Sequence, residues 1–293
     1  MIMTSFKQRH EAYINQIEAA LDKYLESRPP HGLYEAMRYS VFAGGKRIRP
    51  VLMLSVCEAL GGKAEDAMAF ACALEMLHTA SLIHDDMPEI DNDELRRGLP
   101  TCHKKFGQSR ALLAGDALMN LAYEIITSRI AEEPKYAKIG ALMSKWGGSE
   151  GMLAGQYTDV VSEGKKIDEE TLLYIHNNKT GGFIKAAMAV GAMVATKSED
   201  IIKRAESVGE AIGLAFQIKD DILDITQTSD VLGKPAGSDE KNEKATYVSF
   251  YGLEGAKEKY GELCEKIRRD ISSFDGDNKF ISEYVEMLIN RNK

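Results

Sequence analysis

Apolar residues recur at helical spacing, and not at strand spacing, along most of the chain. The clearest run comprises Ile184, Ala187, Met188, Gly191, Val194 and Ala195. Alternating runs of Val, Ile, Thr and aromatic residues, which would indicate strands, are scarce. Proline, which interrupts helices, is absent from residues 135–234. The pattern predicts a mainly α-helical protein with roughly ten or more helices.

Polar stretches that contain glycine and proline predict where the helices end. They cover residues 26–32, 88–100, 162–169, 228–241 and 275–279. None of them resembles an interdomain linker. Segments 184–195 and 211–218 are apolar on most faces, which is typical of helices at the centre of a bundle. We therefore expect a single all-α domain over residues 1–293.

Composition narrows the classes of function. Hydrophobic residues make up 44% of the chain, as in globular proteins, and the net charge of −8 argues against a general nucleic-acid binder. An anionic substrate would therefore need a local basic patch or a metal bridge. No apolar run reaches 18 residues and the N-terminus lacks a signal-peptide pattern, so we expect no membrane span. The four scattered cysteines predict reduced thiols and a cytoplasmic protein.

Two groups of carboxylates each follow an apolar helical segment. The second group is Asp220, Asp221 and Asp224, in which Asp220 and Asp224 are four apart and share one helix face. Each group taken alone is typical of a solvated helix end. Two such groups, accompanied by basic motifs, favour a Mg²⁺ site, because Mg²⁺ takes one or two carboxylates and leaves positions for phosphate and water.

The first group occupies residues 85–93, DDMPEIDND. An unbroken helix would place Asp91 about 120° around from Asp85. Pro88 is predicted to end the helix and let the chain turn back. Asp91 could then approach Asp85 from a loop.

Basic residues form a second set of motifs. The segment GGKRIRP at residues 44–50 places three cations within four residues beside two glycines, which suits a diphosphate, and it lacks the spacing of a P-loop. Arg96 and Arg97 directly follow the first acidic group. His78 lies seven residues before Asp85, on nearly the same helix face. Further cations near predicted helix ends are Lys179, Lys234 and Lys244. The convergence of carboxylates, cations and apolar helices indicates a metal-bound polyanion with a hydrocarbon remainder.

These motifs together resemble the all-trans polyprenyl diphosphate synthases, of the bacterial short-chain type that makes farnesyl or geranylgeranyl diphosphate. The matching segments are GGKRIRP at 44–50, LEMLHTASLIHDDMPEIDNDELRRGLPTCHKKFG at 74–107, KTG at 179–181, FQIKDDILD at 216–224, LGKPAGSD at 232–239 and KATY at 244–247. They occur in the family's order and span almost the whole chain.

The resemblance implies the all-α isoprenoid synthase fold around a deep central cavity, usually in a homodimer. It implies that isopentenyl diphosphate is bound by Gly45, Lys46, Arg49, His78 and Arg97. It implies Mg²⁺, three ions per site, held by Asp85, Asp86, Asp91, Asp220, Asp221 and Asp224. It implies that the allylic diphosphate is contacted by Arg96, Lys179, Lys234 and Lys244. Oxygen dipoles near the developing carbocation are implied at Lys179, Thr180 and Gln217.

The implied activity is Mg²⁺-dependent head-to-tail condensation of isopentenyl diphosphate with an allylic diphosphate. Two alternatives share parts of the pattern. A terpene cyclase also uses aspartate-rich helices and Mg²⁺ but needs one diphosphate site, whereas GGKRIRP and Arg97 indicate a second one. A non-catalytic subunit of a synthase would have lost some carboxylates, and none is missing here.

Product length is expected to depend on the helix before the first acidic group. In the family, the residue five before the first Asp often limits chain growth, and here it is Ala80, followed by Ser81. Helix geometry places only Ser81 on the face of Asp85, so the role of Ala80 rests on the resemblance. Two small residues favour an open floor of the hydrocarbon cavity and therefore a C20 product, with C15 as the main alternative.

Overall fold

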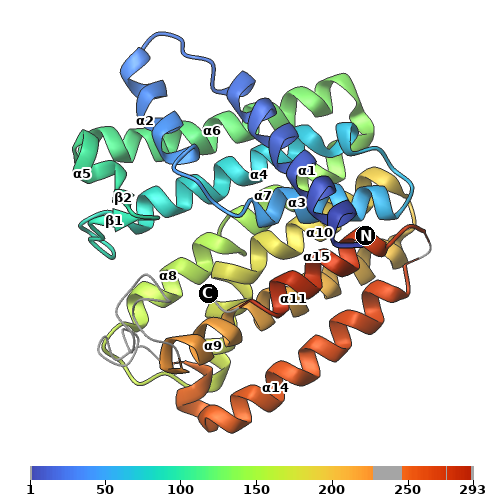
Figure 1. Ribbon diagram of the computed structural model, residues 1–293. Helices are drawn as coiled ribbons and strands as arrows, with labels where there is room; N and C mark the ends of the chain where they lie inside the picture. Colours follow the sequence, from blue (N-terminus) through green and yellow to red (C-terminus); the bar gives the residue numbers. More distant parts are fainter. Residues whose placement is uncertain (1, 227–245, 275, 292–293) are drawn as a thin grey trace.

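The protein, described here from a computed structural model, is almost entirely helical over residues 2–226, 246–274 and 276–291, the part that the structure describes (Figure 1). The α-helices are α1 (Ile2–Tyr24), α2 (His31–Val41), α3 (Ile48–Ala59), α4 (Ala64–Asp85), α5 (Cys102–Phe106), α6 (Gln108–Glu132), α7 (Ala137–Gly147), α8 (Met152–Ser162), α9 (Glu169–Ile175), α10 (Gly181–Ala195), α11 (Glu199–Thr226), α14 (Tyr247–Ser272) and α15 (Lys279–Ile289). Two short helical segments are η1 (Pro134–Tyr136, 3₁₀) and η2 (His176–Thr180, π). The all-α prediction is confirmed.

Helix α10 lies at the centre of the bundle, between α3 and α11 (Figure 1). Every residue from Gly181 to Ala192 is buried, because glycine and alanine on several faces let neighbouring helices approach from several sides. The expectation that residues 184–195 form a central helix is therefore confirmed. Helix α11 packs on one side of α10, with α14 packed in turn against α11, and α3 and α4 pack on the other side.

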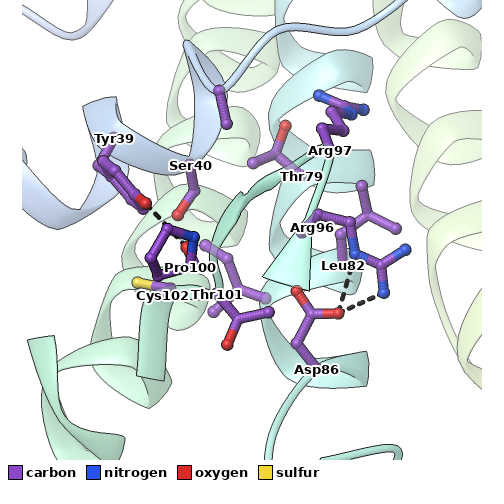
Figure 2. A pocket seen from close by; sticks show the side chains of 12 residues that line it. Tyr39, Ser40, Thr79, Leu82, Asp86, Arg96, Arg97, Pro100, Thr101 and Cys102 are labelled. Atoms are coloured by element: carbon purple, nitrogen blue, oxygen red, sulfur yellow. Dashed lines mark hydrogen bonds and ion pairs between the residues drawn. The ribbon is translucent and has the colours of Figure 1, made fainter. Parts of the chain in front are cut away.

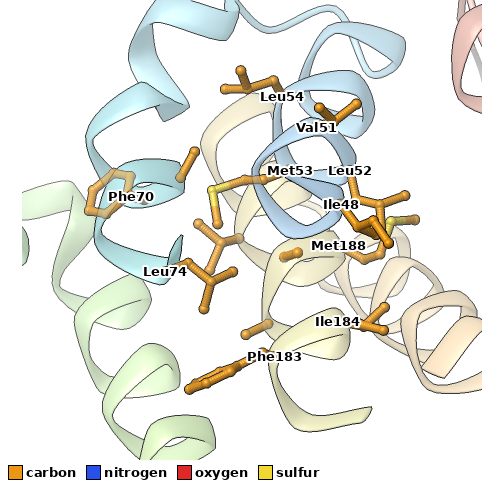
Figure 3. Packing of buried hydrophobic residues seen from close by; sticks show 14 of the residues in the cluster. Ile48, Val51, Leu52, Met53, Leu54, Phe70, Leu74, Phe183, Ile184 and Met188 are labelled. Atoms are coloured by element: carbon orange, nitrogen blue, oxygen red, sulfur yellow. The ribbon is translucent and has the colours of Figure 1, made fainter. Parts of the chain in front are cut away.

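The main core forms where α3, α4 and α10 meet (Figure 3). Leu52 and Met53 of α3, Leu74 of α4, and Phe183 and Met188 of α10 are each at most 1% exposed. Full burial of such a side chain contributes about 1.5–3 kcal/mol. A smaller cluster joins α9, α11 and α14 and comprises Leu172, Ile218, Ile222, Tyr247 and Ala256.

Helix α4 is the one described helix whose length and hydropathy would allow a membrane span. Within the bundle, 72% of its apolar window is buried. A core helix passes the same composition test as a membrane helix, and this degree of burial favours the core reading.

The segment 88–100, expected to be a loop, also contains a small antiparallel hairpin. Strands β1 (Leu95–Arg96) and β2 (Leu99–Pro100) pair around a two-residue turn at Arg97 and Gly98, with φ of 56° and 79°. Two positive φ values in succession are the requirement of a type I′ turn, which joins hairpin strands tightly. Strands of two residues are too short to produce an alternating pattern, which is why no strand was predicted here.

Candidate active site

The first acidic group folds back on the end of α4. The helix ends at Asp85, and the Asp91 backbone N–H donates a hydrogen bond of 3.0 Å to the Asp85 carbonyl. The predicted return of the chain after Pro88 is thus confirmed at the level of the backbone. The Asp85 carboxylate accepts a hydrogen bond from Gln156, and its Oδ1 lies 3.6 Å from Lys179 Nζ.

Helix α8 contributes two side chains that sequence reasoning missed. Gln156 contacts Asp85, and Asp159, one turn later, pairs with Lys179 at 2.6 Å. Between them they connect α8 to the ends of both α4 and η2. Gly155 lets α8 lie directly against the Lys179 backbone, where a Cβ would collide. Two polar residues three apart on one helix face, just after a glycine, were the available signal.

Lys179 is surrounded by carboxylates. Burial works against its charge, but Asp85 and Asp159, with a smaller effect of Asp91, outweigh it and raise the pKa of Lys179. This residue is therefore a fixed cation among acidic groups. Such an arrangement suits a site where a diphosphate and its metal ions meet protein.

The π-helix η2 joins the two acid-bearing helices. Lys179 contacts Asp85 of α4, while the next residue, Thr180, donates a 3.2 Å hydrogen bond to Gln217 Oε1 of α11. A Cβ at Gly213 of α11 would lie 2.7 Å from the Cα of Gly181, which directly follows η2, so α11 can approach this closely only because residue 213 is glycine. Single π-turns inside helical structure are frequent at functional sites, and here one orients consecutive side chains toward different helices.

The second acidic group divides by environment. The Asp220 side chain is 42% exposed and pairs with Arg291 at 2.6 Å, whereas Asp221 and Asp224 are each 2% exposed. Arg291 lies over the Phe216 ring, 3.5 Å from its centroid, and also donates to the Phe216 carbonyl. Sequence reasoning missed Arg291 as a partner, because only the fold brings the segment that follows α15 beside α11.

The basic motif at residues 44–50 also divides. Arg47 is a structural residue: its side chain is 0% exposed and pairs with Glu75 at 2.9 Å and Glu18 at 2.7 Å. Lys46, by contrast, is exposed on the same loop. The three neighbouring cations are therefore not equivalent as diphosphate ligands.

Arg49, His78 and Arg97 form a positive cluster. Arg97 donates to the Gly44 carbonyl and rests against Gly45, where an added Cβ would lie 2.7 Å from Nη1. Burial lowers the pKa of Arg49 to about 10, Arg97 adds to this lowering, and Glu75 opposes it. Burial and the facing arginines also hold the pKa of His78 well below its usual range. Cations pressed together in this way favour a bound polyanion.

Asp86 and Arg96 connect the positive cluster to the acidic group. Arg96 Nε donates to Asp86 Oδ1 at 2.9 Å, and one of its Nη atoms contacts the same oxygen (Figure 2). Asp86 is 3% exposed, and burial raises its pKa in spite of Arg96. Figure 2 shows Arg97 beside Thr79, away from the Asp86–Arg96 pair. Asp86 was expected to bind metal and Arg96 to contact diphosphate. In the structure the two pair with each other, between the positive cluster and the first acidic group.

The carboxylate set fits Mg²⁺ in its chemistry. Oxygen donors come from Asp85, Asp91 and Asp220, and within the described residues no three potential ligands converge into a closed cage. Mg²⁺ is commonly bound by one or two carboxylates, with water and substrate phosphate completing the octahedron. Lys234 and Lys244, expected at the allylic diphosphate, lie outside the described residues.

The two residues expected to set product length differ in exposure. Ala80 is 0% exposed and belongs to the main core, whereas Ser81 is partly exposed and its hydroxyl donates to the His78 carbonyl at 2.8 Å. Of the two, only Ser81 is accessible, on the helix face that also carries Asp85.

Comparisons with known proteins agree with this arrangement. The family model described as polyprenyl synthetase matches residues 30–284. The farnesyl diphosphate synthase of Geobacillus stearothermophilus is 42% identical over 290 residues, covering 96% of this chain and 97% of the relative.

Solved structures show the same fold. Geranylgeranyl pyrophosphate synthetase from Pyrococcus horikoshii superimposes with a TM-score of 0.91 at 28% identity, covering 99% of this chain and 100% of that one. An isoprenoid synthase family member from Thermotoga neapolitana gives a TM-score of 0.82 at 32% identity, covering 96% and 100%. The chain belongs to the polyprenyl synthetase family.

Proposed function

We propose that the protein is a short-chain prenyl diphosphate synthase that condenses isopentenyl diphosphate head-to-tail with an allylic diphosphate. The observation that carries this proposal is the contact between two regions of opposite charge. The positive cluster around Arg97 adjoins the carboxylates at the end of α4 through the Asp86–Arg96 pair. The activities named for the relatives, farnesyl and geranylgeranyl diphosphate synthesis, support it.

The acidic region is proposed to bind the allylic diphosphate. Asp85, Asp91 and Asp220 would hold Mg²⁺, with Lys179 as a direct cationic contact to phosphate oxygen. When bound, Mg²⁺ would neutralise the charge that develops on the departing diphosphate. Asp85 and Asp159 keep Lys179 charged and in place. Three ions per site remain a prediction, which a metal titration against enzyme and diphosphate would check.

Thr180 and Gln217 are proposed to face the carbon from which the diphosphate departs. Their oxygen atoms carry partial negative charge and lie 3.2 Å apart, so they can stabilise positive charge without reorganising. The apolar helices around them exclude water, which would otherwise trap the cation.

The positive cluster is proposed to bind isopentenyl diphosphate. Arg49 and Arg97 supply charge, and His78, neutral because of its lowered pKa, supplies a neutral ring N–H to phosphate oxygen. The double bond of isopentenyl diphosphate then attacks the allylic cation and forms the new C–C bond. A proton is lost from a carbon of the isopentenyl unit, which restores a double bond, and this proton passes to the released diphosphate.

The test is an incubation with isopentenyl diphosphate, an allylic starter and Mg²⁺, followed by chromatography of the dephosphorylated products. We expect elongation to C20, with C15 as the main alternative, and no product without isopentenyl diphosphate or with a chelator present. A cyclic product formed from the allylic diphosphate alone would instead identify a terpene cyclase. No product under any condition would indicate a non-catalytic subunit.

The remaining expectations are also proposals. One domain over residues 1–293 is supported by a core cluster that includes both Tyr13 and Ile289. A homodimer is supported by Leu112 and Leu113 of α6, which are 47% and 57% exposed. Light scattering should give twice the chain mass of 32.4 kDa. Four unpaired, buried cysteines support a reducing, cytoplasmic location.

A further inference from the structure

Asp220 and Asp221 are adjacent in the sequence but stand in different surroundings. The Asp220 side chain is 42% exposed, while that of Asp221 is 2% exposed. Helix geometry accounts for the difference, because consecutive residues point about 100° apart around the axis. Only Asp220 faces the open side of α11.

Both oxygens of Asp221 already accept hydrogen bonds from the protein. Oδ1 accepts from Gln217 Nε2 at 3.1 Å, and Oδ2 accepts from the Tyr247 backbone N–H at 2.8 Å. Tyr247 is the first residue of α14, so this bond fixes the start of that helix against α11. His176 Nε2 lies 4.0 Å from Oδ2 and packs beside the Tyr247 ring. A metal ion bound directly by Asp221 would have to displace these partners and leave buried donors unpaired.

The contact with Gln217 decides which end of its amide faces the reaction. A carboxylate can only accept hydrogen bonds, so the Gln217 amide must direct its NH₂ group toward Asp221. Its oxygen then points the other way, toward Thr180, whose hydroxyl donates to it at 3.2 Å. Reversing the amide would place its oxygen against the Asp221 carboxylate, so that two acceptors would face each other, and its NH₂ group against the Thr180 hydroxyl.

We propose that Asp221 is a positioning residue that orients the Gln217 oxygen toward the allylic cation, and that it does not bind Mg²⁺. This inference rests on the proposed function. It replaces the expectation that all three carboxylates of the second acidic group bind metal. Asp220 keeps that role, because its side chain is 42% exposed and it pairs with Arg291, a cation that a metal ion could replace.

Asp221→Asn and Asp220→Asn form a matched pair of variants on neighbouring positions. Asn at 221 keeps the shape and can still accept from Tyr247, but its NH₂ group then faces Gln217 as a donor and favours the reversed amide. For Asp221→Asn we expect kcat to fall about 10–100-fold, somewhat less than the loss of a direct electrostatic contact, with the Mg²⁺ dependence unchanged. For Asp220→Asn we expect the Mg²⁺ concentration for half-maximal activity to rise clearly.

Two analogues separate positioning from a merely structural effect. One is 2-(dimethylamino)ethyl diphosphate, whose ammonium group stands where the allylic cation forms, and the other is the neutral 3-methylbutyl diphosphate. Asp221→Asn should weaken binding of the ammonium analogue about tenfold and leave the neutral one nearly unchanged, because only the charged analogue senses the Gln217 oxygen. In a Gln217→Leu background, the additional effect of Asp221→Asn should disappear.

The outcomes are distinct. If the wild type neither elongates nor binds either analogue, the proposed function fails. If the wild type does both but Asp221→Asn weakens the two analogues equally, or shifts the Mg²⁺ dependence as Asp220→Asn does, the positioning role is overturned. Should Asp221→Asn not fold, a crystal structure of the wild type with Mn²⁺ and inorganic pyrophosphate decides. Asp221 must keep Gln217 and Tyr247 as partners there, and a bond from Asp221 to metal refutes the proposal.

Discussion

Replacing Glu75 by Gln should destabilise the protein far more than the same change at Glu18, although both carboxylates pair with Arg47. Arg47 is 0% exposed and Glu75 2% exposed, and their Nη1–Oε1 distance is 2.9 Å. Burial opposes the charge of Arg47, but Glu75 and Glu18 outweigh it and raise its pKa. Removing Glu75 leaves a buried cation with one charged partner at the edge of the core.

The magnitude follows from burial. Breaking one side of a buried ion pair costs about 3–5 kcal/mol. Arg47 would keep Glu18 at 2.7 Å and the Val41 carbonyl at 2.6 Å, so Glu75→Gln belongs at the lower end, about 3 kcal/mol. Glu18 is 35% exposed, and solvent screening limits Glu18→Gln to about 1 kcal/mol or less.

Thermal unfolding provides the assay. At about 2 °C per kcal/mol, Glu75→Gln should lower Tm by about 6 °C, and Glu18→Gln by about 2 °C or less. The double variant Arg47→Met/Glu75→Leu removes both charges and should recover most of the loss. Its KM for isopentenyl diphosphate should stay within about threefold of the wild type. Equal Tm losses for the two Glu variants, or a tenfold higher KM in the folded double variant, would refute a structural role for Arg47.

Four further predictions concern the site and its surroundings. Asp85→Ala should reduce kcat by about 10²-fold or more, as for a principal electrostatic stabiliser, and near-normal turnover in a folded variant would remove it from the mechanism. Arg49→Ala should weaken isopentenyl diphosphate and spare the allylic substrate, which separate titrations of the two substrates would show. Ser81→Phe should shorten the product, whereas Ala80→Tyr should mainly destabilise by about 1–3 kcal/mol through overpacking; a shorter product from Ala80→Tyr alone would assign the floor to Ala80 instead. Burial lowers the pKa of His176 from an ordinary 6.5 to about 4, so that, as pH falls, the unfolded chain binds this proton at a higher pH than the folded protein does. Stability should therefore fall by up to about 3 kcal/mol as pH drops from 6.5 to 4, and denaturant titrations should show a weaker pH dependence for His176→Phe.

Sequence alone determined the helical architecture and the chemistry of the site. Helical spacing predicted a bundle with α10 at its centre, because the burial pattern of a helix is written in its own residues. Local geometry also sufficed for the turn after Pro88 that returns Asp91 to Asp85. The order of acidic and basic motifs was enough to identify the family.

Tertiary structure decided which members of each motif reach the site. Arg47 and Arg49 are two residues apart, yet only the packing of α1 and α4 surrounds Arg47 with carboxylates. Asp221 is likewise distinguished from Asp220 by its contact with the start of α14. Burial and partner choice depend on residues far apart in the sequence, and no local pattern records them. For the same reason the contacts of Gln156 and Asp159 with Asp85 and Lys179 follow from the packing of α8 against η2.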